Sequence, residues 1–115
     1  VKFTYKILSE RQMIPKKVIV VQKPTMERRV HATFKNFWPD NDCELIVTSA
    51  SYSYEEYVGK VVDRDIILNI MVGDLQRIKI YPEKGFQIPQ EIPEDVWEAY
   101  EKLVAMGYTK HLIKD

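Results

Sequence analysis

The chain has 115 residues, of which 45% are hydrophobic and 30% charged, and its 17 basic and 17 acidic side chains leave no formal net charge. This length allows one domain at most, and this composition excludes a wholly disordered chain. The single cysteine, Cys43, excludes an intrachain disulfide bond, and no stretch of the sequence approaches the ~20 apolar residues that a membrane-spanning helix needs.

The charges are unevenly distributed along the chain. Residues 1–40 carry nine Lys/Arg against three Asp/Glu, a balance of +6, whereas the other 75 residues carry eight against fourteen, a balance of −6. A basic segment often indicates an anionic partner such as a nucleic acid. Here aromatic side chains do not alternate with the basic ones as a base-stacking surface requires, so the nucleic-acid signal is weak.

A helix is expected at the start of the chain. Residues 1–12 place Val1, Tyr5 and Leu8 on one helical face and most of the charged side chains elsewhere. Pro15 ends this helix, which we expect to belong to a βα unit that precedes the chain.

A strand, a helix and a second strand are expected next. The run "VIVV" at 18–21 is typical of a strand buried on both faces, and "CELIVTS" at 43–49 predicts the second strand. Between them, from Thr25, apolar residues recur at helical spacing. Residues 18–49 therefore predict a βαβ unit, the arrangement that builds parallel sheets.

Two helices are expected in the last part of the chain, residues 63–113. Asp63 can cap a helix that runs to about Tyr81, and the wide apolar stripe of that helix predicts packing on more than one side. The last helix begins near Glu94, with Gly107 as its C-cap.

The loop between the second strand and these helices carries three tyrosines. They either line a pocket or cover the sheet edge, and they are Tyr52, Tyr54 and Tyr57. Two strands alone leave both outer sheet edges open, so we expect the remaining strands of this α/β fold to lie outside the chain. The absence of an initial methionine agrees with a fragment.

Polar residues follow both predicted strands at the edge where open α/β sheets bind ligands. They are Gln22, Lys23 and Thr25 after the first strand and Thr48 and Ser49 after the second. Pro24 stiffens the first turn, and Thr25 either caps the following helix or directs its hydroxyl toward a ligand.

Arg28 and Arg29 lie in the first turn of the predicted helix, where the helix dipole disfavours cations. A positive pair in this place indicates an anionic ligand or, alternatively, a solvated helix start with a structural ion pair. Both alternatives remain open.

Glu27 and His31 are the nearest acid–base candidates, but no nucleophile–base pair is evident, so catalytic residues are unknown and enzymatic activity is left open.

A second candidate cluster lies in "MVGDLQR", residues 71–77. Gly73 costs a helix about 1 kcal/mol relative to alanine, which predicts a close backbone approach at this position. Asp74 and Arg77 stand at i and i+3 and can form an ion pair. Tight helix packing with a local ion pair is the preferred interpretation.

Other features predict core packing instead of chemistry. Cys43 is expected as a small core residue. Trp38, Trp97 and Phe86 are expected as core or loop anchors instead of base-stacking platforms. No His/Cys/Asp cluster has ligand spacing, so no metal site is predicted. The chain also contains no glycine-rich phosphate loop and neither a GxSxG nor an HExxH motif.

Several stretches carry a resemblance to a known family. They are "VIVVQKPTMERR", "FWPD", "VTS" with "SYEEY", "NIMVGDLQRIKIYPEKGFQIPQEIPEDVWEAYEKL" and "GYTKHLI", and they cover nearly all of residues 18–113. With these stretches the chain resembles the C-terminal half of the YdcF-like branch of the YdcF/SanA/ElyC family. The resemblance implies one partial domain over residues 1–115, in a Rossmann-like three-layer fold whose glycine-rich first turn and Glu-Asn motif precede the chain.

The resemblance also implies a ligand and a site. YdcF is described as binding S-adenosylmethionine, whereas SanA and ElyC are linked to the cell envelope. The pocket residues that it carries over are Gln22, Pro24, Met26, Arg28 and Arg29, with Thr48 and Ser49 from the neighbouring strand; Lys23 stands where family members vary.

The leading hypothesis is a cytoplasmic domain that binds a small anionic or nucleotide-like ligand, S-adenosylmethionine being the specific candidate, and that completes its sheet with an N-terminal half. The alternative is a non-enzymatic envelope-linked or scaffold protein that docks on acidic lipid or protein, with membrane association through upstream sequence. A third alternative is an unstable truncation without activity.

Overall fold

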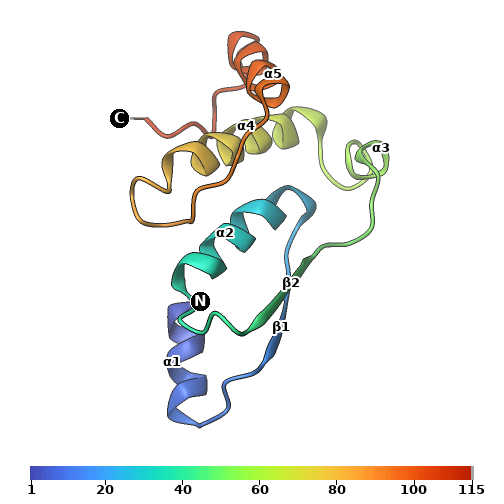
Figure 1. The fold of residues 1–115 in the computed structure, drawn as a ribbon. Coiled ribbons are helices and arrows are strands. Elements are labelled where there is room, and N and C mark those ends of the chain that lie inside the picture. The colour runs from blue at the N-terminus through green and yellow to red at the C-terminus, as the bar shows by residue number, and fades with distance from the viewer. Residues whose placement is uncertain (115) are drawn as a thin grey trace.

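The computed structural model describes residues 1–114 and has an α/β arrangement (Figure 1). Its elements, in chain order, are α1 (Lys2–Glu10), β1 (Lys17–Val21), the 3₁₀ helix η1 (Pro24–Met26), α2 (Glu27–Phe37), β2 (Glu44–Thr48), α3 (Tyr54–Tyr57), α4 (Arg64–Ile80) and α5 (Glu94–Ala105). The predicted helix at the start and the predicted strand–helix–strand order are confirmed, with boundaries that differ by a few residues.

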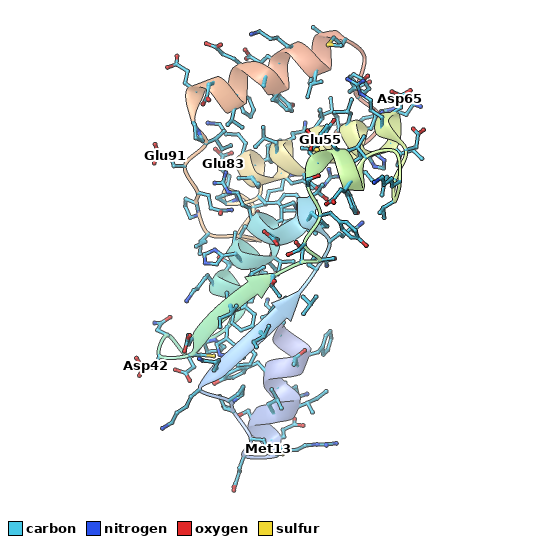
Figure 2. All side chains as sticks on the ribbon, turned by 90° about the vertical axis from the view of Figure 1, so that its right-hand side faces the viewer. Met13, Asp42, Glu55, Asp65, Glu83 and Glu91 are labelled. Atoms are coloured by element: carbon cyan, nitrogen blue, oxygen red, sulfur yellow. The ribbon has the colours of Figure 1, made fainter. Side chains whose placement is uncertain are left out.

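The two strands form one parallel sheet. Lys17 pairs with Glu44 at one end, and Val21 pairs with Thr48 at the other. Figure 2 shows the two arrows side by side, both pointing toward α3 and α4. The carboxyl ends of both strands therefore meet at one edge, and the chain turns there into η1 and α2.

One face of the sheet carries the core of this part of the molecule. Phe34 and Trp38 of the α2 region stack with ring centroids 4.7 Å apart, and Tyr5 of α1 meets Trp38 edge-on at 5.0 Å. Cys43 is buried in the same cluster, against which Leu8 and the inward residues of both strands pack. The prediction that Cys43 lies in the core is confirmed, and of the two alternatives for Trp38, core or loop anchor, the core holds.

The other face of the sheet is uncovered within the described residues. Ile19 is 61% exposed and Val21 is 71% exposed, and Ile46, which pairs with Ile19, is exposed beside them. The prediction that "VIVV" is buried on both faces is therefore wrong for residues 1–114. Successive strand side chains alternate between faces, and the core cluster with its α1 and α2 side chains packs against only one of them.

The tyrosine loop contains a short helix, α3, that the sequence analysis missed. Ser53 Oγ accepts a hydrogen bond from the Glu56 backbone N–H at 3.1 Å, and the Ser53 N–H donates to Glu56 Oε2 at 2.9 Å. This reciprocal pair is a capping box. The Ser-x-x-Glu spacing was present in the sequence and would have predicted it.

The long helix α4 begins and packs as predicted. Asp63 caps it by accepting from the Asp65 N–H at 2.9 Å and from the Ile66 N–H at 3.4 Å. Buried residues occur on several sides of this helix, in agreement with its wide apolar stripe. After α5, Gly107 adopts a left-handed φ of 98°, as its predicted role at a helix C-terminus requires.

The segment after α5 returns along α4. The Lys110 N–H donates to Asn69 Oδ1 at 2.9 Å, and the Ile113 N–H donates to Gln76 Oε1 at 2.7 Å. A Cβ at Gly73 would lie 2.6 Å from the His111 carbonyl oxygen, so the predicted close backbone approach is confirmed. No helix within residues 1–114 combines the length and apolar character needed to cross a membrane.

Candidate functional site

The turn after β1 is tied to the end of β2. The Gln22 N–H donates to the Thr48 carbonyl oxygen at 3.0 Å, and Ser49 Oγ donates to Glu27 Oε1 at 2.5 Å. The structure therefore brings together the polar residues that were predicted to follow the two strands. Lys23 is exposed, and its backbone N–H donates to Gln22 Oε1 at 3.0 Å.

Thr25 does not cap the following helix, contrary to the first of its two predicted roles. Helical turns begin already at Pro24, so Thr25 lies within η1, and neither η1 nor α2 has a side-chain cap. Thr25 Oγ1 is buried and has no hydrogen-bond partner among residues 1–114. Neither of the two predicted roles of Thr25 is therefore filled by a residue in this part of the chain.

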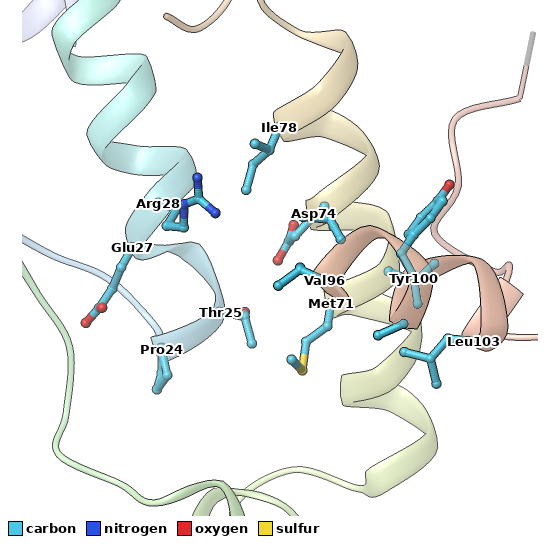
Figure 3. Close-up of a pocket in the computed structure, with 13 residues that line it drawn as sticks. Pro24, Thr25, Glu27, Arg28, Met71, Asp74, Ile78, Val96, Tyr100 and Leu103 are labelled. Carbon is cyan, nitrogen blue, oxygen red and sulfur yellow. The ribbon is translucent and has the colours of Figure 1, made fainter. Parts of the chain in front are cut away.

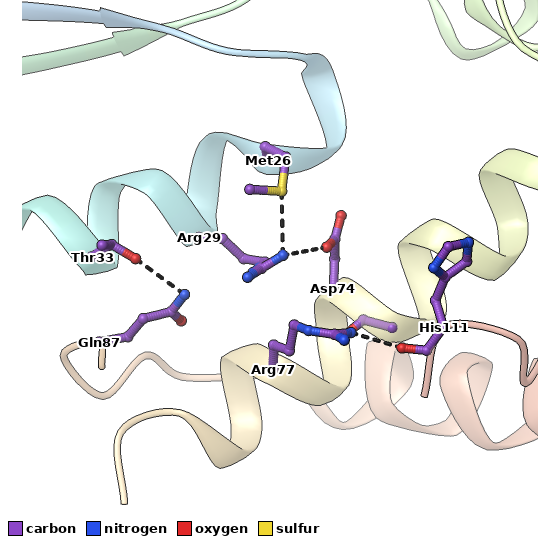
Figure 4. Close-up of polar contacts among 8 residues, drawn as sticks. Met26, Arg29, Thr33, Asp74, Arg77, Gln87 and His111 are labelled. Carbon is purple, nitrogen blue, oxygen red and sulfur yellow. Dashed lines mark hydrogen bonds and ion pairs between the residues drawn. The ribbon is translucent and has the colours of Figure 1, made fainter. Parts of the chain in front are cut away.

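Arg29 forms a structural ion pair. Its Nη1 donates to Asp74 Oδ1 at 2.7 Å, and the two side chains are only 18% and 11% exposed (Figure 4). The same Nη1 lies 3.4 Å from Met26 Sδ, and the guanidinium carbon lies 5.5 Å from the centroid of the Tyr81 ring. Of the two alternatives for Arg28 and Arg29, an anionic ligand or a structural ion pair, the ion pair holds for Arg29. The bond between Arg29 and Asp74 joins the two candidate clusters.

Arg28 has a different environment. Its side chain lies at the surface, and Nη2 donates to the Glu91 carbonyl oxygen at 2.7 Å. It forms no ion pair with any other residue in the described part of the chain. The positive charge of Arg28 is therefore free to meet an anion.

The predicted ion pair between Asp74 and Arg77 is wrong. Arg77 Nη1 donates instead to the Gly73 carbonyl oxygen at 2.9 Å and to the His111 carbonyl oxygen at 2.8 Å (Figure 4). The i, i+3 spacing allowed an ion pair between Asp74 and Arg77. In the fold, Asp74 instead pairs with Arg29, and Arg77 donates to backbone carbonyl oxygens. Arg77 and Gly73 thus hold the C-terminal segment, and only Asp74 of this cluster belongs with the turn after β1.

A pocket of about 350 Å³ opens between this turn and the two long helices α4 and α5 (Figure 3). Its lining residues come from three places in the chain. They are Pro24, Thr25, Glu27 and Arg28 from η1 and the first turn of α2, Met71, Val72, Asp74, Leu75 and Ile78 from α4, and Val96, Ala99, Tyr100 and Leu103 from α5. The walls from α4 and α5 were not predicted from the sequence, although the wide apolar stripe of α4 was a signal for its wall.

The pocket is apolar apart from a few polar groups. Asp74 Oδ2 is buried and, like Thr25 Oγ1, has no hydrogen-bond partner in the described part of the molecule. Burial raises the pKa of the Tyr100 phenol above its ordinary value, and the Glu101 carboxylate adds to this shift. Tyr100 is therefore a neutral phenol at pH 7. The polar groups of the pocket wall are thus two carboxylates, one guanidinium, one buried hydroxyl and one phenol, from Glu27, Asp74, Arg28, Thr25 and Tyr100.

A second, smaller pocket of about 230 Å³ adjoins the first across Pro24, Thr25 and Met71. Its wall includes Tyr52, Tyr54 and Tyr57. The tyrosines therefore line a pocket, as one of the two predictions for them stated.

The described residues give no site for a metal. Residues 1–114 contain no group of three or more His, Cys, Asp and Glu side chains placed to hold an ion. Of the two acid–base candidates, Glu27 is engaged by Ser49, and only Glu27 lies in the pocket wall.

The chain is similar to a protein of Streptomyces coelicolor that carries the description "uncharacterized". The two are 35% identical over 115 residues, which are 100% of this chain and 51% of that protein. The chain thus spans about half the length of the relative that it matches. No family model matches the chain, and no solved structure matches it.

Proposed function

We propose that this chain is the C-terminal part of a YdcF-like domain with a three-layer Rossmann-like fold, and that the domain binds a small nucleotide-like ligand at the carboxyl ends of its parallel strands. The α–β–α–β order and the parallel pairing support this proposal. So does the apolar sheet face at Ile19 and Val21, which a further layer of helices would cover.

The position of the large pocket is the observation that supports ligand binding. Open α/β sheets bind ligands just beyond the carboxyl ends of their strands, beside the first turn of the following helix. The pocket has this position because Pro24, Thr25 and Arg28 form one of its walls. A cavity with mostly apolar walls and a few converging polar groups is also typical of a small-molecule site.

The charges around the pocket narrow the choice of ligand. Asp74 neutralises Arg29, so of the two predicted anion-binding arginines only Arg28 has its charge available. A highly charged ligand such as a triphosphate is therefore a poor match. S-adenosylmethionine is our specific proposal because its carboxylate suits Arg28 and its nucleoside suits apolar walls.

Calorimetry on the full-length protein tests this proposal. We expect S-adenosylmethionine to bind, and we expect Arg28→Ala to weaken binding about tenfold, since one charge-assisted hydrogen bond is removed. Arg64→Ala is the matched control, because Arg64 is also exposed and lies in the first turn of its helix, outside both pockets. No heat of binding, or an equal loss in the two variants, would contradict the proposal.

A further inference from the structure

We propose that the large pocket selects its ligand through an N–H group that Asp74 and Thr25 recognise, and that the ligand is an apolar ring system carrying such a donor. This inference rests on the proposed function. The N–H group is the part of the ligand that enters the pocket most deeply, whereas the proposed function places the ligand in the pocket and its carboxylate at Arg28.

Asp74 provides the first argument. One of its carboxylate oxygens, Oδ1, already accepts from Arg29 at 2.7 Å, but the other, Oδ2, is buried without a partner among residues 1–114. The residue is only 7% exposed and lies in the pocket wall. A buried acceptor left without a hydrogen bond is costly and uncommon in folded proteins, so a ligand donor at this point would be favourable.

Thr25 provides the second argument, from another wall of the pocket. Its hydroxyl is also buried without a partner in the described chain, and it belongs to η1, whereas Asp74 belongs to α4. Figure 3 shows the two side chains directed into the same space. Two residues with unsatisfied polar atoms, from separate elements, therefore line one cavity. A hydroxyl can accept or donate as the ligand requires.

The charge pattern sets the orientation of the ligand. The carboxylate of Asp74 is buried, whereas Arg28 lies at the surface of the same pocket. A carboxylate on the ligand could not donate a hydrogen bond to Asp74 Oδ2, whereas the guanidinium of Arg28 would attract it. The ligand thus enters with its donor-bearing end first and leaves its acidic end at the surface.

The remaining walls define the body of the ligand. Apart from the Tyr100 phenol, they are aliphatic or thioether side chains from both long helices, and among them are Met71, Leu75, Ile78, Val96 and Leu103. Such walls favour a flat or aliphatic apolar body over a phosphate-rich one. The chemical class is therefore an N–H-bearing ring, of which a purine with an exocyclic amine is a member.

Two nucleosides that differ only in that amine test the inference. Calorimetry on the full-length protein would compare adenosine with purine riboside, which lacks the amino group. We expect adenosine to bind at least about tenfold more tightly, because a site built around hydrogen-bonding groups rejects an analogue that leaves them unpaired.

Two variants check that Asp74 and Thr25 cause the discrimination. Thr25→Val replaces the hydroxyl by a methyl group of similar size and is expected to weaken adenosine binding several-fold. Thr33→Val is the matched control on α2, because Thr33 lies outside the pocket and its Oγ1 accepts from Gln87 Nε2 at 3.3 Å. Asp74→Asn is expected to abolish the difference between the two nucleosides. If Asp74→Asn does not fold, judged by its melting curve, the comparison of the two threonine variants decides.

The outcomes separate the two proposals. Equal affinities for adenosine and purine riboside would overturn the inference while leaving the proposed function intact, provided that S-adenosylmethionine binds. Equal effects of the two threonine substitutions would overturn it as well. If neither nucleoside nor S-adenosylmethionine binds, both proposals fail together.

Discussion

Replacing Asp74 by alanine is expected to lower the free energy of unfolding by about 3–5 kcal/mol, the usual cost of removing one partner from a buried ion pair. The variant leaves the Arg29 guanidinium, whose side chain is 18% exposed, without its carboxylate. Arg29 Nε already lacks a partner among residues 1–114, so the guanidinium would lose its only ion pair there. The pair joins α2 to α4, and its loss should loosen the pocket wall.

Urea unfolding of the full-length protein measures this effect. The double variant Arg29→Met with Asp74→Ala should recover part of the loss, because no uncompensated charge stays buried. The matched control is Asp95→Ala, an exposed aspartate in the first turn of α5, which should change stability by no more than about 0.5 kcal/mol. A loss below about 1 kcal/mol for Asp74→Ala would show that the pair does not join the two helices as described.

Replacing Trp38 by alanine is expected to cost about 3–5 kcal/mol, in the range found for large aromatic side chains removed from cores. Trp38 is 6% exposed, stacks on Phe34 and meets Tyr5 of α1 edge-on. Its indole N–H has no hydrogen-bond partner in the described residues, so the loss comes from packing alone. The same unfolding experiment measures it.

Trp97→Ala is the matched control for this substitution. Trp97 is half-buried on α5 and stacks on Tyr100 with centroids 4.5 Å apart, but it lies outside the sheet core. We expect a clearly smaller loss of stability than for Trp38→Ala. An equal or larger loss at Trp97 would contradict the placement of the core on one face of the sheet.

Local features of this fold could be predicted from the sequence because their causes are local. Asp63 indicates the start of α4 because an aspartate is a common N-cap, and Gly107 indicates the end of α5 because glycine readily adopts a left-handed backbone. The close approach at Gly73 was also predictable, since a glycine inside a helix is unfavourable without such a reason. The two strands followed from their β-branched composition and the polar residues around them.

Contacts between distant residues could not be predicted in the same way. Arg29 and Asp74 are 45 positions apart. From the sequence alone, the nearby Arg77 was the more obvious ion-pair partner for Asp74, and nothing pointed to Arg29 instead. The walls that α5 gives to the pocket likewise depend on how that helix lies across α4. The exposed face of β1 was mispredicted because composition alone does not tell which faces of a strand are covered.

Locating bound S-adenosylmethionine on the protein tests directly whether the large pocket is the ligand site. Backbone N–H chemical shifts of the labelled full-length protein would be followed by NMR during titration with S-adenosylmethionine. We expect the largest changes at residues 24–28, 71–78 and 96–103, the three segments that line the large pocket. An absence of changes, or changes confined to the exposed sheet face at residues 17–21, would contradict this expectation.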